Sequence, residues 1–157
     1  MYFRIEYKGT SVPFQTTSVL GKNYAYAFLC AIAVGVYLGM NLVEILECLK
    51  TYKQPEHRTN ILPSIKDSWI IDDSYNASPL AVISSLELLI ALPANRRIFV
   101  LGDMKELGSY TETAHRQIGD EIIKHNIDLV ISIGDYTKHT DNQLAKNGFN
   151  IHNINHF

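Results

Sequence analysis

The sequence contains few cysteines, few charged residues and no excess of one charge. Of its 157 residues two are cysteine, and 14 Lys and Arg against 16 Asp and Glu give a net charge of -2. Proteins that bind the phosphate backbone of nucleic acids carry a basic excess, so we expect no nucleic-acid partner. Cys30 and Cys48 lie in apolar helical patterns without metal-ligand spacing, which argues against a disulfide framework and a zinc site. These features favour a cytoplasmic protein.

The usual loops that bind phosphates or dinucleotides are also missing. Gly21-Lys22 resembles the end of a P-loop, but that motif requires Gly five residues earlier and Ser or Thr next, where this chain has Thr16 and Asn23. The sequence has no Gly-x-Gly-x-x-Gly, no Gly-x-Ser-x-Gly and no His and Cys cluster with metal spacing. It therefore predicts no metal site, no nicotinamide or flavin cofactor and no serine-hydrolase elbow.

One long apolar segment is present, because residues 24–43 carry no charge over a length that can span a bilayer. Two interpretations are open: a membrane span, or a helix whose small residues pack closely against a sheet. The many Ala and Gly residues, Asn41 and the lack of a flanking Lys and Arg cluster favour the second. Polar or alternating residues precede the segment, which argues against a secretion signal. We expect no membrane span.

The first third of the chain shows strand and helix patterns in turn. Residues 2–8 alternate apolar and polar side chains, which predicts a strand, and a turn at Gly9 leads to a second short strand at 12–14. Helices are expected at 23–38 and 42–52. The polar, Pro-flanked connector at 53–63 is a candidate domain boundary.

After this connector, strands and helices alternate. We expect strands at 69–72, 98–101, 129–133 and 149–154. Ser78 and Pro79 should begin one helix, a capping box of Ser109 and Glu112 a second, and residues 137–146 should form a third that Gly148 ends. This order predicts an α/β fold with a doubly wound, mostly parallel sheet.

Three of the expected strands end in aspartate. Asp72 and Asp73 follow the first, Asp103 the second and Asp135 the third. Ligands bind beyond the carboxyl ends of the strands in such sheets, so these carboxylates are candidate ligand-binding groups. The alternative is that each Asp caps the following loop or helix.

Two blocks resemble those of a known family. The block Asp72-Asp73-Ser74-Tyr75-Asn76-Ala77-Ser78-Pro79 resembles a signature of the Mur ligases, the ATP-dependent ligases of peptidoglycan precursor synthesis. The block Val100-Leu101-Gly102-Asp103-Met104-Lys105-Glu106-Leu107-Gly108, with His115 and Gly119 downstream, is similar to one in the branch that adds D-alanyl-D-alanine. The resemblance implies that residues 1–62 form the end of the central ATPase domain, and residues 63–157 a Rossmann-like carboxy-terminal domain truncated at its end.

The resemblance also implies an activity. Family members use ATP and Mg²⁺, and this branch joins D-alanyl-D-alanine to UDP-N-acetylmuramoyl-tripeptide through an acyl phosphate. The phosphate-binding lysine loop and the magnesium ligands of the family would lie outside this chain. We therefore expect a fragment that is inactive alone and needs the missing ligase domains as partners.

The resemblance implies roles for several residues that occupy matching positions in the family's motifs. In Pro55-Glu56-His57-Arg58, Arg58 would reach the ATP phosphates, and its alternative is a surface arginine in a linker. Asp73 would accept the ribose hydroxyls, and its alternative is a loop cap. The remaining residues expected at the ATP site are Tyr75, Asn76, Asn23 and Tyr26.

A second group of residues would shape the domain and its closure, without catalysis and without binding metal. They are Asp72, Gly102, Asp103 and Glu106, and His115 is expected to be a packed helix histidine.

The sequence departs from the family pattern at three positions. Lys22 and Tyr26 stand where relatives commonly have His and Asn, and Ser78 stands where many have Asn. An aromatic at 26 can stack on adenine but cannot supply amide hydrogen bonds.

Two other functions stay open. One is a stand-alone, non-catalytic Rossmann-like module for binding or assembly. The other is a different member of the ligase superfamily, of the folylpolyglutamate or cyanophycin type, against which Tyr75-Asn76-Ala77 argues.

Overall fold

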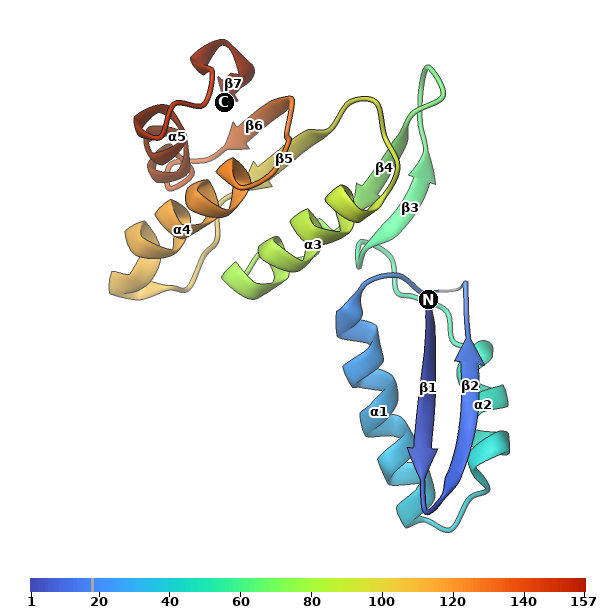
Figure 1. Cartoon of the computed structure of the whole chain (residues 1–157). Coiled ribbons are helices and arrows are strands. Elements are labelled where there is room, and N and C mark those ends of the chain that lie inside the picture. The colour runs from blue at the N-terminus through green and yellow to red at the C-terminus, as the bar shows by residue number, and fades with distance from the viewer. Residues whose placement is uncertain (18) are drawn as a thin grey trace. The chain divides into compact units, whose positions relative to one another are not determined.

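The computed structural model describes residues 1–17 and 19–157, and the chain forms two compact units, Met1–Ser74 and Tyr75–Phe157. Figure 1 shows the helices and strands of both units. Each unit has its own hydrophobic core. Within the described ranges, no helix combines the length and the apolar character that a membrane crossing needs. The domain division expected after residue 62 stays a prediction.

The first unit opens with the predicted hairpin. Strands β1 (Tyr2–Tyr7) and β2 (Thr10–Gln15) pair antiparallel, with Tyr7 opposite Thr10. Lys8 and Gly9 between them have positive φ angles of 46° and 78°, as the two-residue turn that matches strand twist requires. The second strand is longer than predicted.

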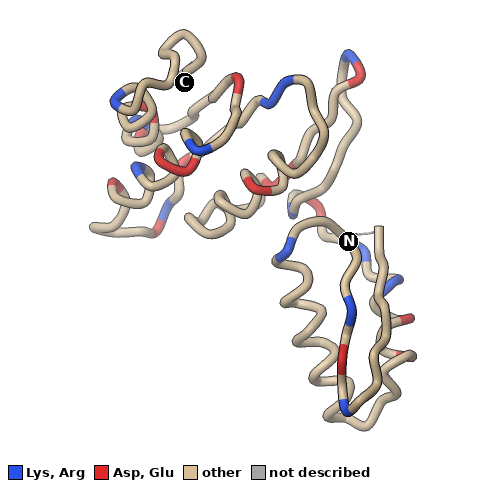
Figure 2. The backbone as a smooth tube through the Cα atoms, viewed as in Figure 1, with Lys and Arg blue, Asp and Glu red and all other residues tan. Residues whose placement is uncertain are grey.

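Two helices follow the hairpin, close to their predicted ranges: α1 (Lys22–Tyr37) and α2 (Leu42–Lys50). Asn41 begins α2, since its Oδ1 accepts a hydrogen bond from the Val43 N–H at 2.8 Å. A Cβ on Gly35 would lie 2.7 Å from Ile45 Cδ1, so this glycine allows the two helices to approach closely. The sequence predicted close packing against a sheet, but at Gly35 the neighbour is a helix. Figure 2 shows α1 without a charged position after its first turn.

The first unit ends with a second hairpin, which the sequence did not predict. Strands β3 (Asn60–Pro63) and β4 (Trp69–Asp72) pair antiparallel. Lys66 and Asp67 turn the chain with positive φ angles of 53° and 56°. The prediction that residues 69–72 form a strand is confirmed. The prediction that this strand belongs to the parallel sheet is wrong, because its hydrogen-bonded partner is β3.

The second unit is the α/β part of the chain. Strands β5 (Ile98–Gly102), β6 (Leu129–Ile133) and β7 (Ile154–His156) form a parallel sheet in that order. Helices α3 (Pro79–Ala91), α4 (Thr111–Ile123) and α5 (Lys138–Lys146) contribute Leu86, Ile118 and Leu144 to a core with Leu101 and Val130 of the sheet. The predicted α/β class with a parallel sheet is confirmed.

The helix starts of this unit agree only in part with the sequence. Ser78 caps α3 as predicted, since its Oγ accepts a hydrogen bond from the Ala81 N–H at 3.4 Å. The prediction that Ser109 and Glu112 form a capping box is wrong. A short 3₁₀ helix at Gly108–Tyr110 precedes α4, and Glu112 forms an ion pair with Arg116 at 2.8 Å instead.

At the end of the second unit, one prediction is confirmed and one is wrong. Gly148 follows α5 with a φ of 83°, the predicted way of ending that helix. The last strand, predicted at 149–154, begins only at Ile154, because Ile151–Asn153 form a 3₁₀ helix.

Candidate functional site

The loop before β3 and the first turn of α1 meet at Arg58. The Tyr24 hydroxyl donates a hydrogen bond to the Arg58 carbonyl at 3.2 Å, and the side-chain amide of Gln54 donates to the same oxygen. The Arg58 N–H donates to Asn60 Oδ1 at 3.1 Å. The backbone of the predicted phosphate-binding arginine is therefore held through both of its polar groups.

The predicted ribose acceptor, Asp73, belongs to the same neighbourhood. The Thr59 hydroxyl donates to Asp73 Oδ1 at 3.2 Å. Burial raises the pKa of Tyr24, the nearby Tyr52 and Asp73 raise it further, and Arg58 opposes them. The Tyr24 bond to the Arg58 carbonyl and the bond from the adjacent Thr59 to Asp73 thus bring one predicted cation and one predicted carboxylate into the same neighbourhood.

Asp72 has a different set of contacts. Its Oδ2 lies 2.8 Å from His57 Nδ1, while its Oδ1 accepts from the Ser74 hydroxyl at 2.6 Å and the Ser74 N–H at 3.1 Å. The bond from the Ser74 hydroxyl, and then that from His57, hold the pKa of Asp72 below its usual value. Asp72 thus ties the end of β4 to the Arg58 loop.

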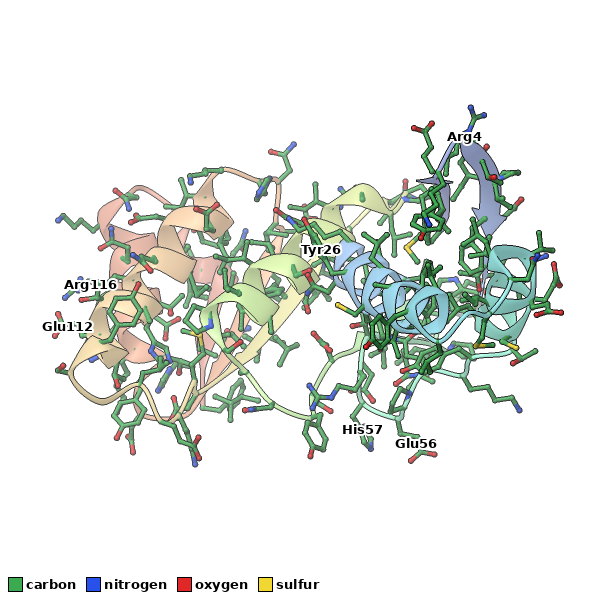
Figure 3. The ribbon with its side chains drawn as sticks, turned by 90° about the horizontal axis from the view of Figure 1, so that it is seen from below. Arg4, Tyr26, Glu56, His57, Glu112 and Arg116 are labelled. Carbon is green, nitrogen blue, oxygen red and sulfur yellow. The ribbon has the colours of Figure 1, made fainter. Side chains whose placement is uncertain are left out.

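The backbone on both sides of Arg58 is unusual. His57 and Thr59 have φ angles of 60° and 62°, in the left-handed region that a β-branched residue such as Thr rarely adopts. Backbone of this kind persists where surrounding contacts impose it, and it is concentrated at functional sites. Figure 3 shows His57 beside Glu56 on this loop.

The other residues expected at the ATP site are exposed. Tyr26, labelled in Figure 3, is 67% exposed. Asn23, near the start of α1, is exposed as well. Tyr75 is 66% exposed, and Asn76 Oδ1 accepts a hydrogen bond from the Ala77 N–H at 2.8 Å; both residues begin the second unit. Their roles toward adenine and the nucleotide crevice stay predictions.

Asp103 lies at the carboxyl end of β5 and holds the start of α5. Its Oδ1 accepts from the N–H groups of Tyr136 at 2.9 Å and Thr137 at 3.1 Å. A Cβ on Gly134, whose φ is 115°, would lie 2.5 Å from the Asp103 carboxylate. Asp135, by contrast, has a side chain that is 89% exposed and pairs with Lys138 at 3.2 Å. Asp103 therefore has a structural role at the start of α5, whereas Asp135 is a carboxylate on the surface.

The loop after β5 is also held by a buried histidine. Thr111 O lies 2.8 Å from His115 Nδ1, and the Met104 N–H donates to His115 Nε2 at 3.2 Å. Because a carbonyl can only accept, Nδ1 carries the proton and the ring is neutral. His115 is fully buried, which agrees with its interpretation as a packed histidine. In the same loop, Gly102 and Glu106 are exposed, and Glu106 has a φ of 63°.

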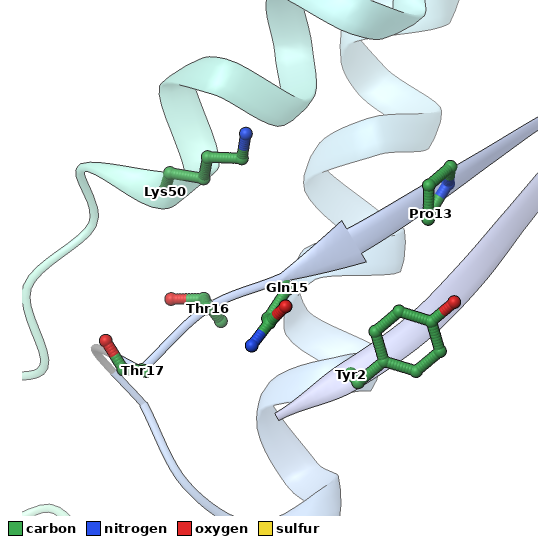
Figure 4. A pocket seen from close by; sticks show the side chains of 6 residues that line it. All are labelled: Tyr2, Pro13, Gln15, Thr16, Thr17 and Lys50. Carbon is green, nitrogen blue, oxygen red and sulfur yellow. The ribbon is translucent and has the colours of Figure 1, made fainter.

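An open pocket of about 700 Å³ lies at the end of the first hairpin (Figure 4), and it contains none of the predicted site residues. Its lining is Tyr2, Pro13, Gln15, Thr16, Thr17 and Lys50. Among the residues that the structure describes, no group of three or more His, Cys, Asp or Glu could hold a metal ion. The pocket therefore adds nothing to the site around Arg58.

Sequence reasoning missed the residues that support Arg58. They are Tyr24, Gln54, His57 and Thr59. Tyr24 falls in an apolar helical pattern, where its hydroxyl gives no signal, and its partner lies 34 residues away.

Comparison with known proteins identifies the family. Residues 57–157 match the family described as "Mur ligase, glutamate ligase domain". The chain belongs to the Mur ligase family. This match contains Arg58, Asp73 and Asp103, the three residues around which the contacts above are built.

Curated Mur ligases provide sequence relatives. The UDP-N-acetylmuramoyl-tripeptide--D-alanyl-D-alanine ligase of Bacillus subtilis is 33% identical over 117 residues, which cover 74% of this chain and 26% of that protein. The ligase of the same name from Escherichia coli is 32% identical over 114 residues, which cover 73% of this chain and 25% of that protein. The chain thus spans about a quarter of the length of the curated relatives it matches.

Solved Mur ligases share the fold. A MurF structure from Acinetobacter baumannii matches 99% of this chain and 32% of that chain, with a TM-score of 0.86 and 20% identity. The MurF ligase of Thermotoga maritima, solved in complex with ADP, matches 99% of this chain and 39% of that chain, with a TM-score of 0.75 and 21% identity.

Proposed function

We propose that the chain forms part of an ATP-dependent Mur ligase that joins D-alanyl-D-alanine to UDP-N-acetylmuramoyl-tripeptide through an acyl phosphate. The names of the curated relatives support the reaction. The ADP in the Thermotoga maritima structure supports a nucleotide as ligand. The single observation that carries the proposal is that two hydrogen bonds bring Arg58 and Asp73 together: Tyr24 Oη donates to the Arg58 carbonyl, and the neighbouring Thr59 hydroxyl donates to Asp73. We propose Arg58 for the phosphates and Asp73 for the ribose of one nucleotide.

Arg58 would neutralise charge on the ATP phosphates. Phosphoryl transfer depends mainly on positioning and on compensation of negative charge, and a permanently charged, forked guanidinium suits both tasks. The contacts to its carbonyl and N–H hold its backbone in place.

Asp73 would accept hydrogen bonds from the ribose hydroxyls. A carboxylate offers about four acceptor positions. The two oxygens of Asp73 can therefore accept hydrogen bonds both from a protein donor such as Thr59 and from a ligand. Asn23 and Tyr26 of the first unit would face the adenine, and Tyr75 and Asn76 are the residues of the second unit that we propose for the nucleotide.

The residues described do not fit a magnesium site, since none of them form a cluster of three or more metal-ligating side chains. We assign no magnesium ligand and no catalytic residue to this chain. The Mg²⁺ that accompanies ATP would be held by the remaining ligase domains. The isolated chain is proposed to be inactive, and a cytoplasmic location stays a prediction.

A chimera tests this proposal. In the Bacillus subtilis ligase, the stretch that matches this chain is replaced by the chain itself, and ligation is followed with ATP, Mg²⁺, the tripeptide precursor and D-alanyl-D-alanine. We expect the chimera to form product and the isolated chain to form none.

Variants of the chimera then test the two residues. Arg58→Ala should lower kcat/KM about 10- to 100-fold, because a hydrogen bond to a charged group contributes about 1.5–3 kcal/mol. Asp73→Asn should raise KM for ATP, whereas Asp135→Asn, on the exposed carboxylate, is the control and should change nothing. Product formed by the chain alone, or full activity of Arg58→Ala, contradicts the proposal.

A further inference from the structure

We propose that Tyr24 is a positioning residue: its hydroxyl, together with the amide of Gln54, fixes the peptide of Arg58 so that the guanidinium is presented to the phosphates of a nucleotide. The nucleotide as ligand rests on the proposed function. The fixing of the peptide rests on the contacts of the first unit alone.

The carbonyl of Arg58 is the centre of this arrangement. It accepts hydrogen bonds from Tyr24 Oη, on α1, and from the side-chain amide of Gln54, in the segment that follows α2. A carbonyl oxygen has two lone pairs, so both bonds can form together. With the N–H bonded to Asn60, the peptide groups on both sides of the Arg58 Cα are restrained.

The loop needs this restraint because of its backbone. His57 and Thr59 both have left-handed φ angles, which a chain without holding contacts leaves for more favourable regions. The Thr59 hydroxyl bond to Asp73 and the His57 contact with Asp72 hold the two flanking residues. Tyr24 and Gln54 hold Arg58, the residue between His57 and Thr59.

Tyr24 is well suited to this role because its ring is itself held. The ring centroid lies 6.2 Å from that of Tyr52 and 6.5 Å from that of Phe28, and the side chain is half-buried. Burial, Tyr52 and Asp73 raise the pKa of Tyr24 against the opposing effect of Arg58, so the hydroxyl keeps its proton and remains a donor at neutral pH.

Amide hydrogen exchange of the whole chain, followed by NMR, tests the fixing of the peptide. Tyr24→Phe removes the hydroxyl and keeps the ring. We expect exchange at the Arg58 and Thr59 amides to become about fivefold faster, the factor that corresponds to a lost hydrogen bond of about 1 kcal/mol. The ¹⁵N order parameters of these amides should fall as well.

Two more variants complete this experiment. Gln54→Ala removes the second donor to the same carbonyl and should have a similar effect. Tyr37→Phe, on the exposed tyrosine at the end of the same helix, is the control and should leave the loop unchanged. Unchanged exchange and order parameters in Tyr24→Phe, or an equal change in Tyr37→Phe, would overturn the proposal.

Ligand titration separates positioning from a merely structural role. Because Arg58 is proposed to act on the phosphates, Tyr24→Phe should weaken binding of ATP about fivefold and leave binding of adenosine unchanged. In an Arg58→Ala background, Tyr24→Phe should have no further effect on ATP. Equal weakening of both ligands, or additive losses, contradicts positioning. If the unaltered chain binds neither ligand, the proposed nucleotide site fails for the isolated chain, while the exchange experiment still decides the role of Tyr24.

Discussion

Asp103 should stabilise the second unit through the start of α5, and its replacement by Ala tests this. The change removes the acceptor of two backbone N–H groups, those of Tyr136 and Thr137. A helix-start acceptor contributes about 0.5–2 kcal/mol, and hydrogen bonds to a charged group lie at the upper end of such ranges. We expect Asp103→Ala to lower the free energy of unfolding by about 2 kcal/mol, and Asp103→Asn, which keeps an acceptor oxygen, by about half of that.

Gly134 provides a second test at the same place. Its φ is 115°, and a Cβ added to it would lie 2.5 Å from the Asp103 carboxylate, so Gly134→Ala introduces both backbone strain and a clash. Removing the carboxylate relieves the clash but not the strain. Gly134→Ala should therefore be less destabilising in an Asp103→Ala background, with a coupling of at least about 0.5 kcal/mol.

Urea unfolding followed by circular dichroism measures these changes. Fluorescence of the single tryptophan is unsuitable, because Trp69 belongs to the first unit. Asp135→Ala is the matched control, since this neighbouring carboxylate is exposed and pairs across the surface with Lys138. Equal stabilities of Asp103→Ala and Asp135→Ala, or strictly additive effects of Asp103→Ala and Gly134→Ala, would refute the reasoning.

Three further predictions concern other contacts. Gly35→Ala should destabilise the first unit by about 1 kcal/mol, because overpacking against Ile45 outweighs the gain in helix propensity, and Ile45→Val should restore part of the loss; thermal unfolding checks both. Asp72→Asn should lower stability by less than about 1 kcal/mol, since the His57 partner is exposed. The pKa of Asp72 lies below its usual 3.8, so this difference should be complete above about pH 4 and vanish as the pH falls through the lowered pKa; urea unfolding at several pH values shows whether it does. His115→Phe should lower stability by about 2 kcal/mol, because the Met104 N–H loses its acceptor inside the protein; calorimetry that finds no change contradicts this.

Local signals in the sequence were sufficient for much of the fold. The alternation in β1, the cap at Ser78 and Gly148 after α5 act over a few residues, and each lies where the pattern indicates. The β3–β4 hairpin was missed because its turn uses Lys66 and Asp67, whereas Asn-Gly or Asp-Gly is the usual signal for two residues with positive φ. The predicted start of α4 was wrong because a 3₁₀ turn takes the place of the expected capping box.

Sequence reasoning reached the candidate site through one strand end and through the family motifs. Arg58 came from the family resemblance alone, whereas Asp73 was already a candidate because it follows an apolar strand, and the resemblance gave it the ribose role. The structure adds the contacts that hold both residues. The hydrogen bond from Tyr24 to Arg58 connects residues that are far apart in sequence. The Gln54 amide reaches the same carbonyl only because the chain turns between Gln54 and Arg58. Hydrogen bonds of this kind have no periodicity, so no pattern in the sequence reports them.

The aspartates that end the strands show why a shared sequence context does not imply a shared role. Asp72, Asp103 and Asp135 each follow an apolar strand, yet the first ties a loop through His57 and Ser74, the second holds α5 and the third pairs on the surface. The carboxylate that differs from all three is Asp73, which lies where Thr59, Tyr24 and Arg58 converge. Because a nucleotide offers both hydroxyls and phosphates, a carboxylate and a cation near each other can bind one such molecule, and the proposal for this chain depends on Asp73 and Arg58 rather than on the strand ends as a class.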